Sequence, residues 1–400
     1  MGKTGTTDSL NPSVCIADLT GRSRPYDFHL ANAMEERKGD FSIWIGGKDE
    51  RSTGTIDQVC EPPLNFASRL SMDWRRTRKT LKAIEYMGNL ARLYLWGLRK
   101  RIDVLHFQWL PLLEVAPALE LLHLRWAQRK GFRVVYTVHN VLPHDTGYEH
   151  RFAYRNVYHC VDALICHTDD ACRRLIDEFG VEAEKIWVIP HGPLSEEISF
   201  FTQEKARDEL QLDPESSMCL LFGFIRPYKG AKFLIDAWRR VVDQEPTARL
   251  VLAGKPEEKY GETLLKKIET LKLTREIDTC FKFILKGKLS LLVHAADVLV
   301  YPYRGITQSG ALLTGLTTGK PVVATDVGGF SEMIQHGETG ALVEYGNEEQ
   351  LAKELLDLLQ DPERRKQMGQ NAREMVKTEY SWDAISRKTL ECYKNVISKL

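Results

Sequence analysis

Residues 303–329 read YRGITQSGALLTGLTTGKPVVATDVGG, and this stretch decides the class of fold. Residues 322–324 are apolar and small or β-branched, which is typical of a buried strand, and a pair of glycines follows soon after. A helix-like segment precedes the strand and begins on residues 307–310, which are small and rich in donors. The order of helix, short buried strand and glycine turn predicts an α/β unit.

The start of this helix is a candidate anion site. The first backbone N–H groups of a helix have no partner within it, and the small residues Ser309, Gly310 and Ala311 would let a phosphate approach them. The ordinary alternative is a capped helix with Thr307 or Ser309 as its N-cap. Both interpretations stand at this point.

The same alternation of strand and helix signals runs along the whole chain. Apolar runs of strand length occur in the first half at residues 13–19, 41–47, 104–110, 133–139, 162–168 and 186–192. The second half repeats them at residues 218–225, 248–254, 281–285, 297–303, 320–327 and 340–346. Amphipathic segments lie between or after these runs, at residues 27–38, 169–179, 232–244, 349–361 and 384–399. Such alternation predicts parallel sheets with helices on both faces.

Length and rhythm together predict two domains. A chain of 400 residues is too long for one ordinary core. The apolar rhythm lapses at residues 193–203, directly after the run IWVIPHG. We therefore expect an N-terminal domain over residues 1–192, a C-terminal domain over residues 193–382 and a final helix over residues 383–400.

Composition narrows the function classes. Lys and Arg together number 55, as do Asp and Glu, so the net charge favours no particular partner. The eight cysteines show no metal-ligand spacing, which indicates reduced thiols in a reducing compartment. Residues 1–13 are polar and contain no apolar signal core, and no run reaches transmembrane length. We expect a cytoplasmic protein.

A second candidate anion site lies at residues 220–238, LLFGFIRPYKGAKFLIDAW. This stretch indicates a strand, a tight loop and a helix, and the loop carries Arg226 and Lys229. Two cations before a helix N-terminus suit a phosphorylated ligand, although solvated loop cations are common. In the first half, His139 ends a buried run, where a histidine is more often structural than functional.

These motifs resemble the GT-B glycosyltransferases of family 4. The resemblance is carried by FIRPYKG at residues 224–230, by GKPVVATDVGGFSEMIQHGETGALVE at 319–344 and by EYSW at 379–382, with TVHN at 137–140 and IWVIPHG at 186–192. It covers nearly all of the chain and is strongest over residues 222–344. It implies two Rossmann-like doubly wound domains facing a central cleft, with the C-terminal helix returning to the N-domain. The C-terminal domain would hold a nucleotide-sugar donor, and the N-terminal one the acceptor.

The resemblance also implies roles for the cations and the histidine. Lys229 would hold the donor diphosphate, and His139 would approach the donor sugar. Arg226 would assist Lys229, because the position where the family often has its arginine holds Phe224 here.

Other matching positions belong to the donor site. The backbone at Gln308, Ser309, Gly310 and Ala311 would hold the distal phosphate, and Gly254 matches the glycine that closes the strand LVLAG. The family usually needs no metal and no other cofactor. Asp169 and Asp170 in HTDDAC do not form an Asp-x-Asp metal motif and indicate the start of a helix instead.

One departure concerns two glutamates that the family commonly carries eight positions apart. The corresponding positions here hold Ile306 and Thr314. Thr314 could offer the nucleotide ribose only a neutral hydrogen bond, and Ile306 could offer the sugar none. The nucleotide, the sugar and the stereochemical outcome are therefore left open.

Residues 69–101 form a basic stretch that the net charge hides. Ten Lys or Arg face two acids, Asp73 and Glu85, so the stretch carries +8, with Trp74, Tyr86, Tyr94 and Trp96 among the cations. An aromatic-rich basic helix pair suits an anionic membrane surface. The alternative is a solvated helical face over an aromatic-packed core. No module for nucleic-acid binding accompanies the charge.

The resemblance implies a hexosyltransferase. It would move a sugar from a nucleoside diphosphate to a glycan or lipid-linked hydroxyl group with retention, and the leaving phosphate would help to deprotonate the acceptor. Two rival functions are a nucleotide-sugar 2-epimerase, which can share this fold, and a transferase-like binding subunit, which Ile306 and Thr314 would favour. The protein would be cytoplasmic or peripheral on the inner face of the membrane.

Overall fold

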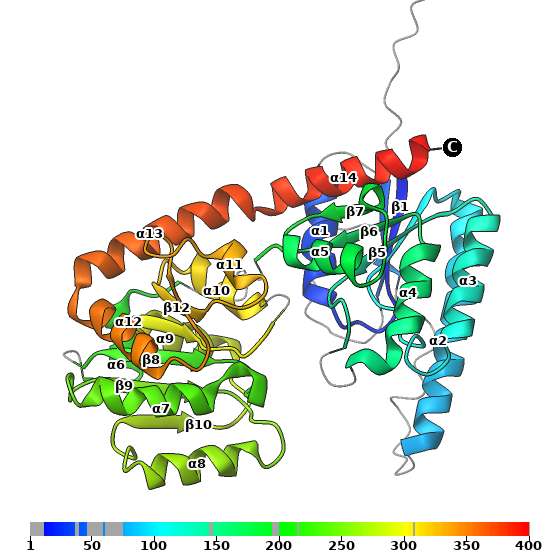
Figure 1. Cartoon of the computed structure of the whole chain (residues 1–400). Coiled ribbons are helices and arrows are strands. Elements are labelled where there is room, and N and C mark those ends of the chain that lie inside the picture. Colours follow the sequence, from blue (N-terminus) through cyan, green and yellow to red (C-terminus); the bar gives the residue numbers. More distant parts are fainter. Residues whose placement is uncertain are drawn as a thin grey trace, which may run out of the picture. The chain divides into compact units, whose positions relative to one another are not determined.

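The computed structural model of the chain describes residues 12–36, 40–45, 59–60, 75–143, 147–193, 200–213, 216–306 and 309–399. For residues 40–45, 59–60 and 75–79 the description covers the backbone alone. The chain divides into two compact units, one of Met1–His191 with Trp382–Leu400 and one of Gly192–Ser381. Each unit is a parallel sheet with helices around it (Figure 1), so the predicted doubly wound α/β class is confirmed.

The described part of the first unit contains a seven-stranded parallel sheet in the order β3-β2-β1-β4-β5-β6-β7. Its strands are β1 (Ser13–Asp18), β2 (Asp40–Ile45), β3 (Val59–Cys60), β4 (Val104–Phe107), β5 (Arg133–Val138), β6 (Ala163–Cys166) and β7 (Ile186–Val188). Its helices are α1 (Arg24–Glu35), α2 (Arg75–Lys100), α3 (Pro117–Arg129), α4 (Arg151–Cys160), α5 (Asp169–Asp177) and α14 (Trp382–Ser398), with short 3-10 turns at Gly147–His150 and Ala183–Lys185.

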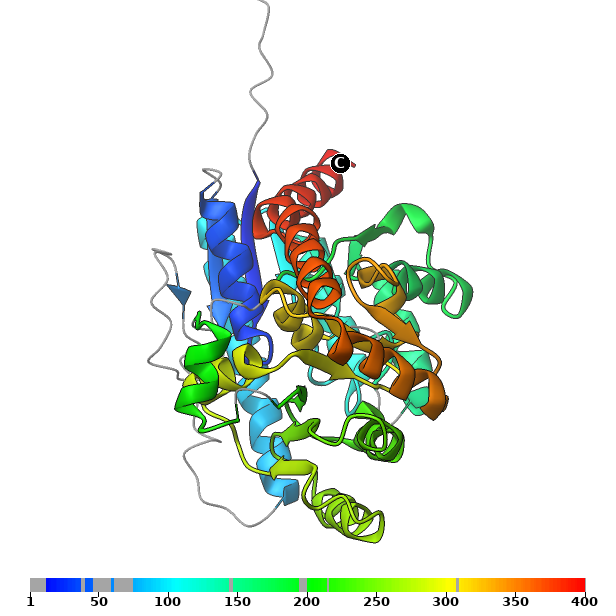
Figure 2. The same ribbon diagram turned by 90° about the vertical axis from the view of Figure 1, so that its left-hand side faces the viewer.

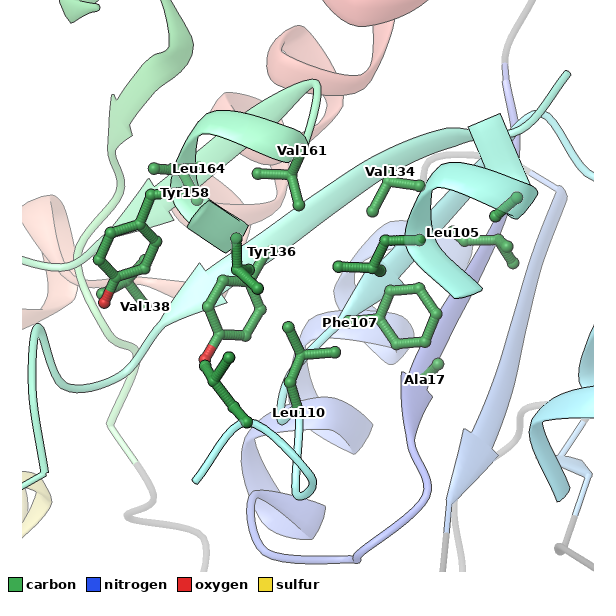
Figure 3. Packing of buried hydrophobic residues seen from close by; sticks show 14 of the residues in the cluster. Ala17, Leu105, Phe107, Leu110, Val134, Tyr136, Val138, Tyr158, Val161 and Leu164 are labelled. Carbon is green, nitrogen blue, oxygen red and sulfur yellow. The ribbon is translucent and has the colours of Figure 1, made fainter. Parts of the chain in front are cut away.

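The two faces of this sheet bury alternate residues, as the period of a strand requires. One face carries Leu105 and Phe107 of β4 with Val134 and Tyr136 of β5 into a core beneath α2, α3 and α4. Figure 3 shows these side chains packed together with residues of β6 and α4. The strands are short and apolar because both of their faces are buried.

The other face of this sheet is covered by α1 and by α14, which lies along α1 (Figure 2). Ile385, Cys392 and Tyr393 of α14 are fully buried in the same cluster as Val14 and Ile16 of β1. The predicted return of the C-terminal helix to the N-terminal unit is thus confirmed. The first unit therefore contains two segments that are far apart in the sequence.

The second unit repeats this plan. Its described part holds a six-stranded parallel sheet in the order β10-β9-β8-β11-β12-β13. Its strands are β8 (Met218–Phe222), β9 (Arg249–Ala253), β10 (Ile277–Cys280), β11 (Val298–Tyr301), β12 (Val322–Thr325) and β13 (Ala341–Val343). Its helices are α6 (Gln203–Glu209), α7 (Ala231–Val242), α8 (Tyr260–Thr270), α9 (Lys286–Ala295), α10 (Gly310–Thr317), α11 (Phe330–Met333), α12 (Glu348–Gln360) and α13 (Pro362–Glu379), with a 3-10 turn at Pro227–Lys229.

Two sequence expectations were wrong. The apolar run at 281–285 is not a strand: β10 ends at Cys280, and Phe283 and Leu285 are largely exposed. The edge strand is the mixed segment Ile277–Cys280, in which Asp278 and Thr279 are exposed, so its composition gave no strand signal. The basic stretch forms one helix, α2, in its described part rather than a pair; residues 69–74 lie outside the described residues.

Both sheets reverse their strand order once, between β1 and β4 and between β8 and β11. In doubly wound sheets the turns that follow the two strands at such a reversal form the ligand site. The turns after β8 and β11 carry Lys229 and Ser309. The turns after β1 and β4 carry Ser23 and Gln108, close to the turn after β5 that carries His139.

Candidate active site

The turn between β8 and α7 is tightly fitted to its neighbours. Gly223 follows β8 at φ +100°, and Gly230 precedes α7 at φ +70°. A Cβ on Gly230 would lie 1.7 Å from the carbonyl oxygen of Pro302, which follows β11. Only glycine therefore allows the start of α7 to lie against the chain that leaves β11.

Lys229 is held inside this turn, with 8% of its side chain exposed. Its Nζ lies 5.2 Å from the ring centroid of Tyr303 and 3.1 Å from where a Cβ on Gly223 would stand. Burial lowers the pKa of this ammonium group, Tyr228 acts in the opposite direction, and Arg226 lowers it further. A partly desolvated cation at a strand end is suited to an anionic ligand, which would restore the lost solvation.

Tyr303 connects the turn after β8 with the turn after β11. Its buried ring lies beside Lys229, and the Ser309 side chain lies next to its hydroxyl group and acts against the rise in pKa that burial causes. Ser309 is the N-cap of α10, and its Oγ accepts a hydrogen bond from the Leu312 N–H at 3.2 Å. The structure thus brings Lys229 and the start of α10 to the same aromatic ring.

The cap at Ser309 confirms the ordinary interpretation of this helix start, and it leaves the phosphate interpretation as a prediction. Gly310 and Ala311 form the first turn of α10, and the Tyr301 hydroxyl donates to the Ala311 carbonyl at 2.8 Å. Gln308, like Thr307, lies outside the described residues.

Arg226 is placed differently from Lys229. Its guanidinium lies 5.0 Å from the Phe224 ring, and its Nε is 3.7 Å from Oε1 of Glu257, with both charged side chains more than a third exposed. Glu257 is positioned by its own N–H, which donates to the Ile225 carbonyl at 3.0 Å. Arg226 therefore faces a carboxylate that a bound anion would have to displace or share.

The remaining predicted donor residues act through the backbone or lie on α10. Gly254 has φ +149°, and a Cβ there would lie 1.8 Å from the Gly223 carbonyl oxygen, so glycine keeps the two strand ends together. Thr314 is half-buried on α10. Ile306 packs against the core of this unit, and its carbonyl oxygen would lie 1.8 Å from a Cβ on Gly328. An apolar contact therefore stands where the related family has a carboxylate.

His139 lies in the first unit, directly after β5. Its Nε2 is 2.9 Å from Oε1 of Gln108 and 3.3 Å from Oγ of Ser23, and its Nδ1 is 3.3 Å from Nε2 of His167. The Trp109 ring stacks on its imidazole at 4.9 Å with an interplanar angle of 13°. Burial lowers the pKa of His139 well below its usual range, and neighbouring histidines add to this effect.

Sequence reasoning did not single out the side chains around His139. The signal that could have found them is the position after each strand, since β4 is followed by Gln108 and Trp109 and β6 by His167. Parallel neighbours in register, Val138 opposite Cys166, place the next residues of the two strands side by side. Because His139 and His167 occupy equivalent positions after paired strands, their contact could have been predicted.

Three further findings concern metal ligands, the start of α5 and membrane-spanning helices. Within the ranges that the structure describes, no group of three or more His, Cys, Asp or Glu is arranged to hold a metal ion. Asp169 and Asp170 open α5 behind the N-cap Thr168, which confirms the predicted helix start. Among the described residues, no helix has both the length and the apolar composition that crossing a bilayer requires.

Models of known protein families match both units of the chain. The family model described as Glycosyl transferases group 1 matches residues 202–375, and the model described as Glycosyltransferase Family 4 matches residues 28–193. A D-inositol 3-phosphate glycosyltransferase of Corynebacterium efficiens is 26% identical over 243 residues, which cover 58% of this chain and 56% of that protein. The chain thus spans little more than half the length of the curated relatives it matches.

Solved structures resemble the chain over almost its whole length. The sucrose-phosphate synthase of Thermosynechococcus elongatus has a TM-score of 0.74 at 16% identity and covers 98% of this chain and 100% of its own. The HepE protein of Anabaena, solved in complex with UDP, has a TM-score of 0.72 at 16% identity, with 97% and 100% covered. The same protein with UDP-glucose has a TM-score of 0.68 at 18% identity, with 97% and 99% covered. At these identities the likeness concerns the fold.

Proposed function

Because the chain belongs to the GT-B glycosyltransferases of the group 1 and family 4 type, we propose that it moves a hexosyl unit from a nucleoside diphosphate sugar to a hydroxyl group. The acceptor would be a glycan or a lipid-linked sugar, and the transfer would proceed with retention and without a metal. The UDP and UDP-glucose complexes of the Anabaena relative support a donor of this class.

The observation that carries the proposal is the turn of the second unit that holds the buried cation Lys229. Lys229, the Tyr303 ring and the capped start of α10 adjoin one another at the two strands where the sheet order reverses. An ammonium group and the N–H groups at a helix start can both donate hydrogen bonds to the oxygens of a diphosphate. The related family binds its donor at the matching positions.

In this proposal the second unit stabilises the leaving group. As the bond from the sugar to the diphosphate breaks, negative charge grows on the departing phosphate oxygen, and Lys229 is already in place to meet it. Because this lysine is poorly solvated beforehand, little solvent has to reorganise when the charge develops. The departing phosphate oxygen takes the proton of the acceptor hydroxyl, so no carboxylate base is required at Ile306 or Thr314.

The first unit would contact the sugar and the acceptor. His139 is half-buried at the end of β5, and its imidazole is held in one plane by Trp109. A neutral imidazole in that position can accept a hydrogen bond from a hydroxyl group. Its role is therefore to orient the sugar rather than to carry charge.

We also infer that the first unit docks on an anionic lipid surface through one face of α2 and α3. Figure 1 shows these helices side by side, and Tyr94 of α2 lies 5.0 Å from Trp126 of α3, ring to ring. This α2–α3 face consists of large apolar side chains that are exposed: Leu95, Leu98, Leu119, Leu122 and Trp126.

Charge supports the lipid as the occupant of the α2–α3 face. Among the described side chains, the exposed cations on the same two helices are Lys82, Arg92, Arg99, Lys100, Arg125 and Arg129. Apolar side chains that enter the headgroup region, flanked by cations, are the pattern of a surface-bound helix. The surface would present lipid-linked acceptors to the first unit.

A nucleotide-sugar 2-epimerase remains the alternative, and a binding subunit without turnover is favoured only by Ile306 and Thr314. One experiment separates the three. The full chain is incubated with a panel of nucleoside diphosphate hexoses, with and without sugar-terminated lipid acceptors, and the products are resolved by mass spectrometry and NMR.

Transfer to an acceptor, or slow release of nucleoside diphosphate without one, supports the transferase. An epimeric donor formed without acceptor supports the epimerase. A rise in melting temperature with donor but no product of either kind would overturn both enzymes and leave a binding protein.

A further inference from the structure

A chain of hydrogen bonds crosses the strand ends of the first unit, from Trp109 to Ile189. Nε1 of Trp109 donates to Oγ of Ser23 at 2.7 Å, and that oxygen lies 3.3 Å from Nε2 of His139. Nδ1 of His139 lies 3.3 Å from Nε2 of His167. Nδ1 of His167 then lies 2.9 Å from the carbonyl oxygen of Ile189, which is the last group in this series of hydrogen bonds.

The two ends of this chain fix its direction. The indole N–H of Trp109 can only donate, and the Ile189 carbonyl can only accept. A hydroxyl group or a neutral imidazole between them donates once and accepts once. His167 must therefore carry its hydrogen on Nδ1 to reach Ile189, which leaves its Nε2 to accept from Nδ1–H of His139. The hydroxyl hydrogen of Ser23 then points to Nε2 of His139.

Both imidazoles meet the condition of neutrality. Burial lowers the pKa of His167 to about 4, and the hydrogen bond to Ile189 acts in the opposite direction with a smaller effect. Burial also lowers the pKa of His139, and the neighbouring His167, His191 and His106 lower it further. Each ring therefore carries one hydrogen at neutral pH.

Gln108 completes the arrangement from the other side. Its carboxamide oxygen is placed 2.9 Å from Nε2 of His139, and its nitrogen 3.3 Å from Nε2 of His106. A half-turn of the amide exchanges these two atoms, since the shape of the group does not change. With the nitrogen toward His139, the amide donates to the lone pair on Nε2 of that ring. Its oxygen then shares the Nε2–H of His106 with Oγ1 of Thr137, which lies 2.6 Å from that nitrogen. Nδ1 of His106 accepts from the Tyr393 hydroxyl at 2.6 Å.

Access differs between the two histidines. His167 is buried, with 6% of it exposed, whereas His139 is half-buried at the strand end. The stacked Trp109 ring on one side and the edge of Tyr26 at 5.5 Å hold the plane of His139. A substrate can therefore reach His139 but not the residue that determines its hydrogen.

We propose that His167 is a positioning residue: held by the Ile189 carbonyl, it fixes His139 as the Nδ1–H tautomer and makes Nε2 of His139 an acceptor for a hydroxyl group. The inference rests on the proposed function only in naming that hydroxyl as one of the sugar, which takes the place of Ser23 or Gln108 as donor. The tautomer itself does not depend on any activity.

The test is the tautomer of His139 in the full chain, measured without substrate by NMR on protein labelled with ¹⁵N-histidine, with His139→Gln used to assign its signals. We expect Nδ1 to be protonated and Nε2 to be unprotonated at pH 7. His167→Phe removes the acceptor and should give His139 a mixture of tautomers. His167→Gln can accept from His139 and donate to Ile189, and it should restore the single Nδ1–H form.

Turnover provides the second readout. His167→Phe should lower kcat about tenfold, since one hydrogen bond contributes roughly the free energy of a decade in rate, while the KM for the donor stays within about twofold. A hydrogen on Nε2 of His139 in the wild type would overturn the proposal even if His167→Phe does not fold. An unchanged tautomer in His167→Phe would also overturn it. Absence of any glycosyl transfer beside the expected tautomer would refute the proposed function and leave the positioning role intact.

Discussion

The ammonium group of Lys229 lies 5.2 Å from the centroid of the Tyr303 ring, although the two residues belong to turns that follow different strands. The ring provides a weak attraction to a cation that has lost most of its water. The charge is thus kept in place by a neutral partner, which an incoming diphosphate does not have to displace.

Replacing Lys229 by methionine should cripple transfer while the fold is kept. The variant retains the shape of the side chain and loses only the charge that meets the leaving phosphate. We expect transition-state stabilisation to fall by roughly 2–4 kcal/mol, which would be measured as a lower kcat/KM. Lys266→Met, which removes an exposed lysine of α8, is the matched control and should leave turnover unchanged. Steady-state rates near those of the wild type in Lys229→Met would remove this lysine from the mechanism.

The affinity for a nucleoside diphosphate should depend on the charge of Lys229. Burial lowers the pKa of this group from the ordinary lysine value of 10.5, and a bound anion favours the protonated form. Affinity should therefore be constant below the lowered pKa of the free protein and fall by up to about tenfold per pH unit above it. Calorimetric titration should show this decline beginning at a lower pH than for an exposed lysine. In Lys229→Met the alkaline decline should be absent, and its persistence would assign it to another group.

Glu257 should restrain Arg226 in the free protein. Because the pair is largely exposed and its closest atoms are 3.7 Å apart, its contribution is small, about 0–1 kcal/mol. Glu257→Gln should tighten nucleoside diphosphate binding by up to about fivefold, because Arg226 is freed to contact the anion. The double variant with Arg226→Ala is the control, since the gain should vanish there. An equal gain in both backgrounds would mean that Arg226 does not contact the ligand.

Asp27 should make the stability of the protein depend on pH. This carboxyl group on α1 is fully buried; burial, followed by the charge of Asp18 and a hydrogen bond to it, raises its pKa well above the usual value of 3.8. The folded state therefore holds a proton that the unfolded state releases above pH 3.8. The stabilising contribution of that proton is complete below the unfolded pKa and declines, by up to about 1.4 kcal/mol per pH unit, until the folded pKa is passed.

Asp27→Asn removes this titration and should flatten the decline of the free energy of unfolding between pH 4 and neutrality. Urea denaturation at several pH values measures the slope. Glu36→Gln, at the exposed end of the same helix, should leave the slope as in the wild type. A slope equal to that of the wild type in Asp27→Asn would place the proton elsewhere.

Binding to lipid should depend on the α2–α3 face. Leu119 and Leu122 are exposed on α3, so Leu119→Ser with Leu122→Ser should leave the fold intact and weaken binding to phosphatidylglycerol vesicles at least about tenfold. Leu265→Ser, an equally exposed leucine of α8, is the control. Each cation near the surface adds about 1 kcal/mol, so Arg125→Gln with Arg129→Gln should weaken binding further and reduce its salt dependence. Wild-type protein that does not sediment with these vesicles at low salt would refute the surface.

The sequence predicted the strands that are continuously apolar and missed the edge strand β10, which is not. Runs such as those ending at Phe107 and Val138 are continuously apolar, since helices cover both sides of the sheet. Strand β10 lies at an edge and exposes Asp278, so its pattern carries no such signal, whereas the exposed Phe283 and Leu285 gave a false one. An apolar run therefore predicts a strand only where its residues are both buried and paired with a neighbouring strand.

The site was predictable only in part, for a related reason. Lys229 and Ser309 could be placed because each stands between a strand and a helix in the sequence. The partners of His139 come from three other strand ends, and their contact depends on strand order, which local patterns do not contain. Arg226 could not be assigned to Glu257 either, since that contact arises from the loop after β9.

The helix α14, whose Tyr393 hydroxyl lies 2.6 Å from Nδ1 of His106, has a consequence for biosynthesis. A ribosome makes this segment only after the whole of the second unit, so the second unit can fold during synthesis while the first unit still lacks one of the two helices that cover Val14 and Ile16. The nascent first unit thus leaves the part of this apolar face that α14 will cover accessible to chaperones throughout the translation of about half of the chain. Its two parts join in the last step, when the returning helix closes the core.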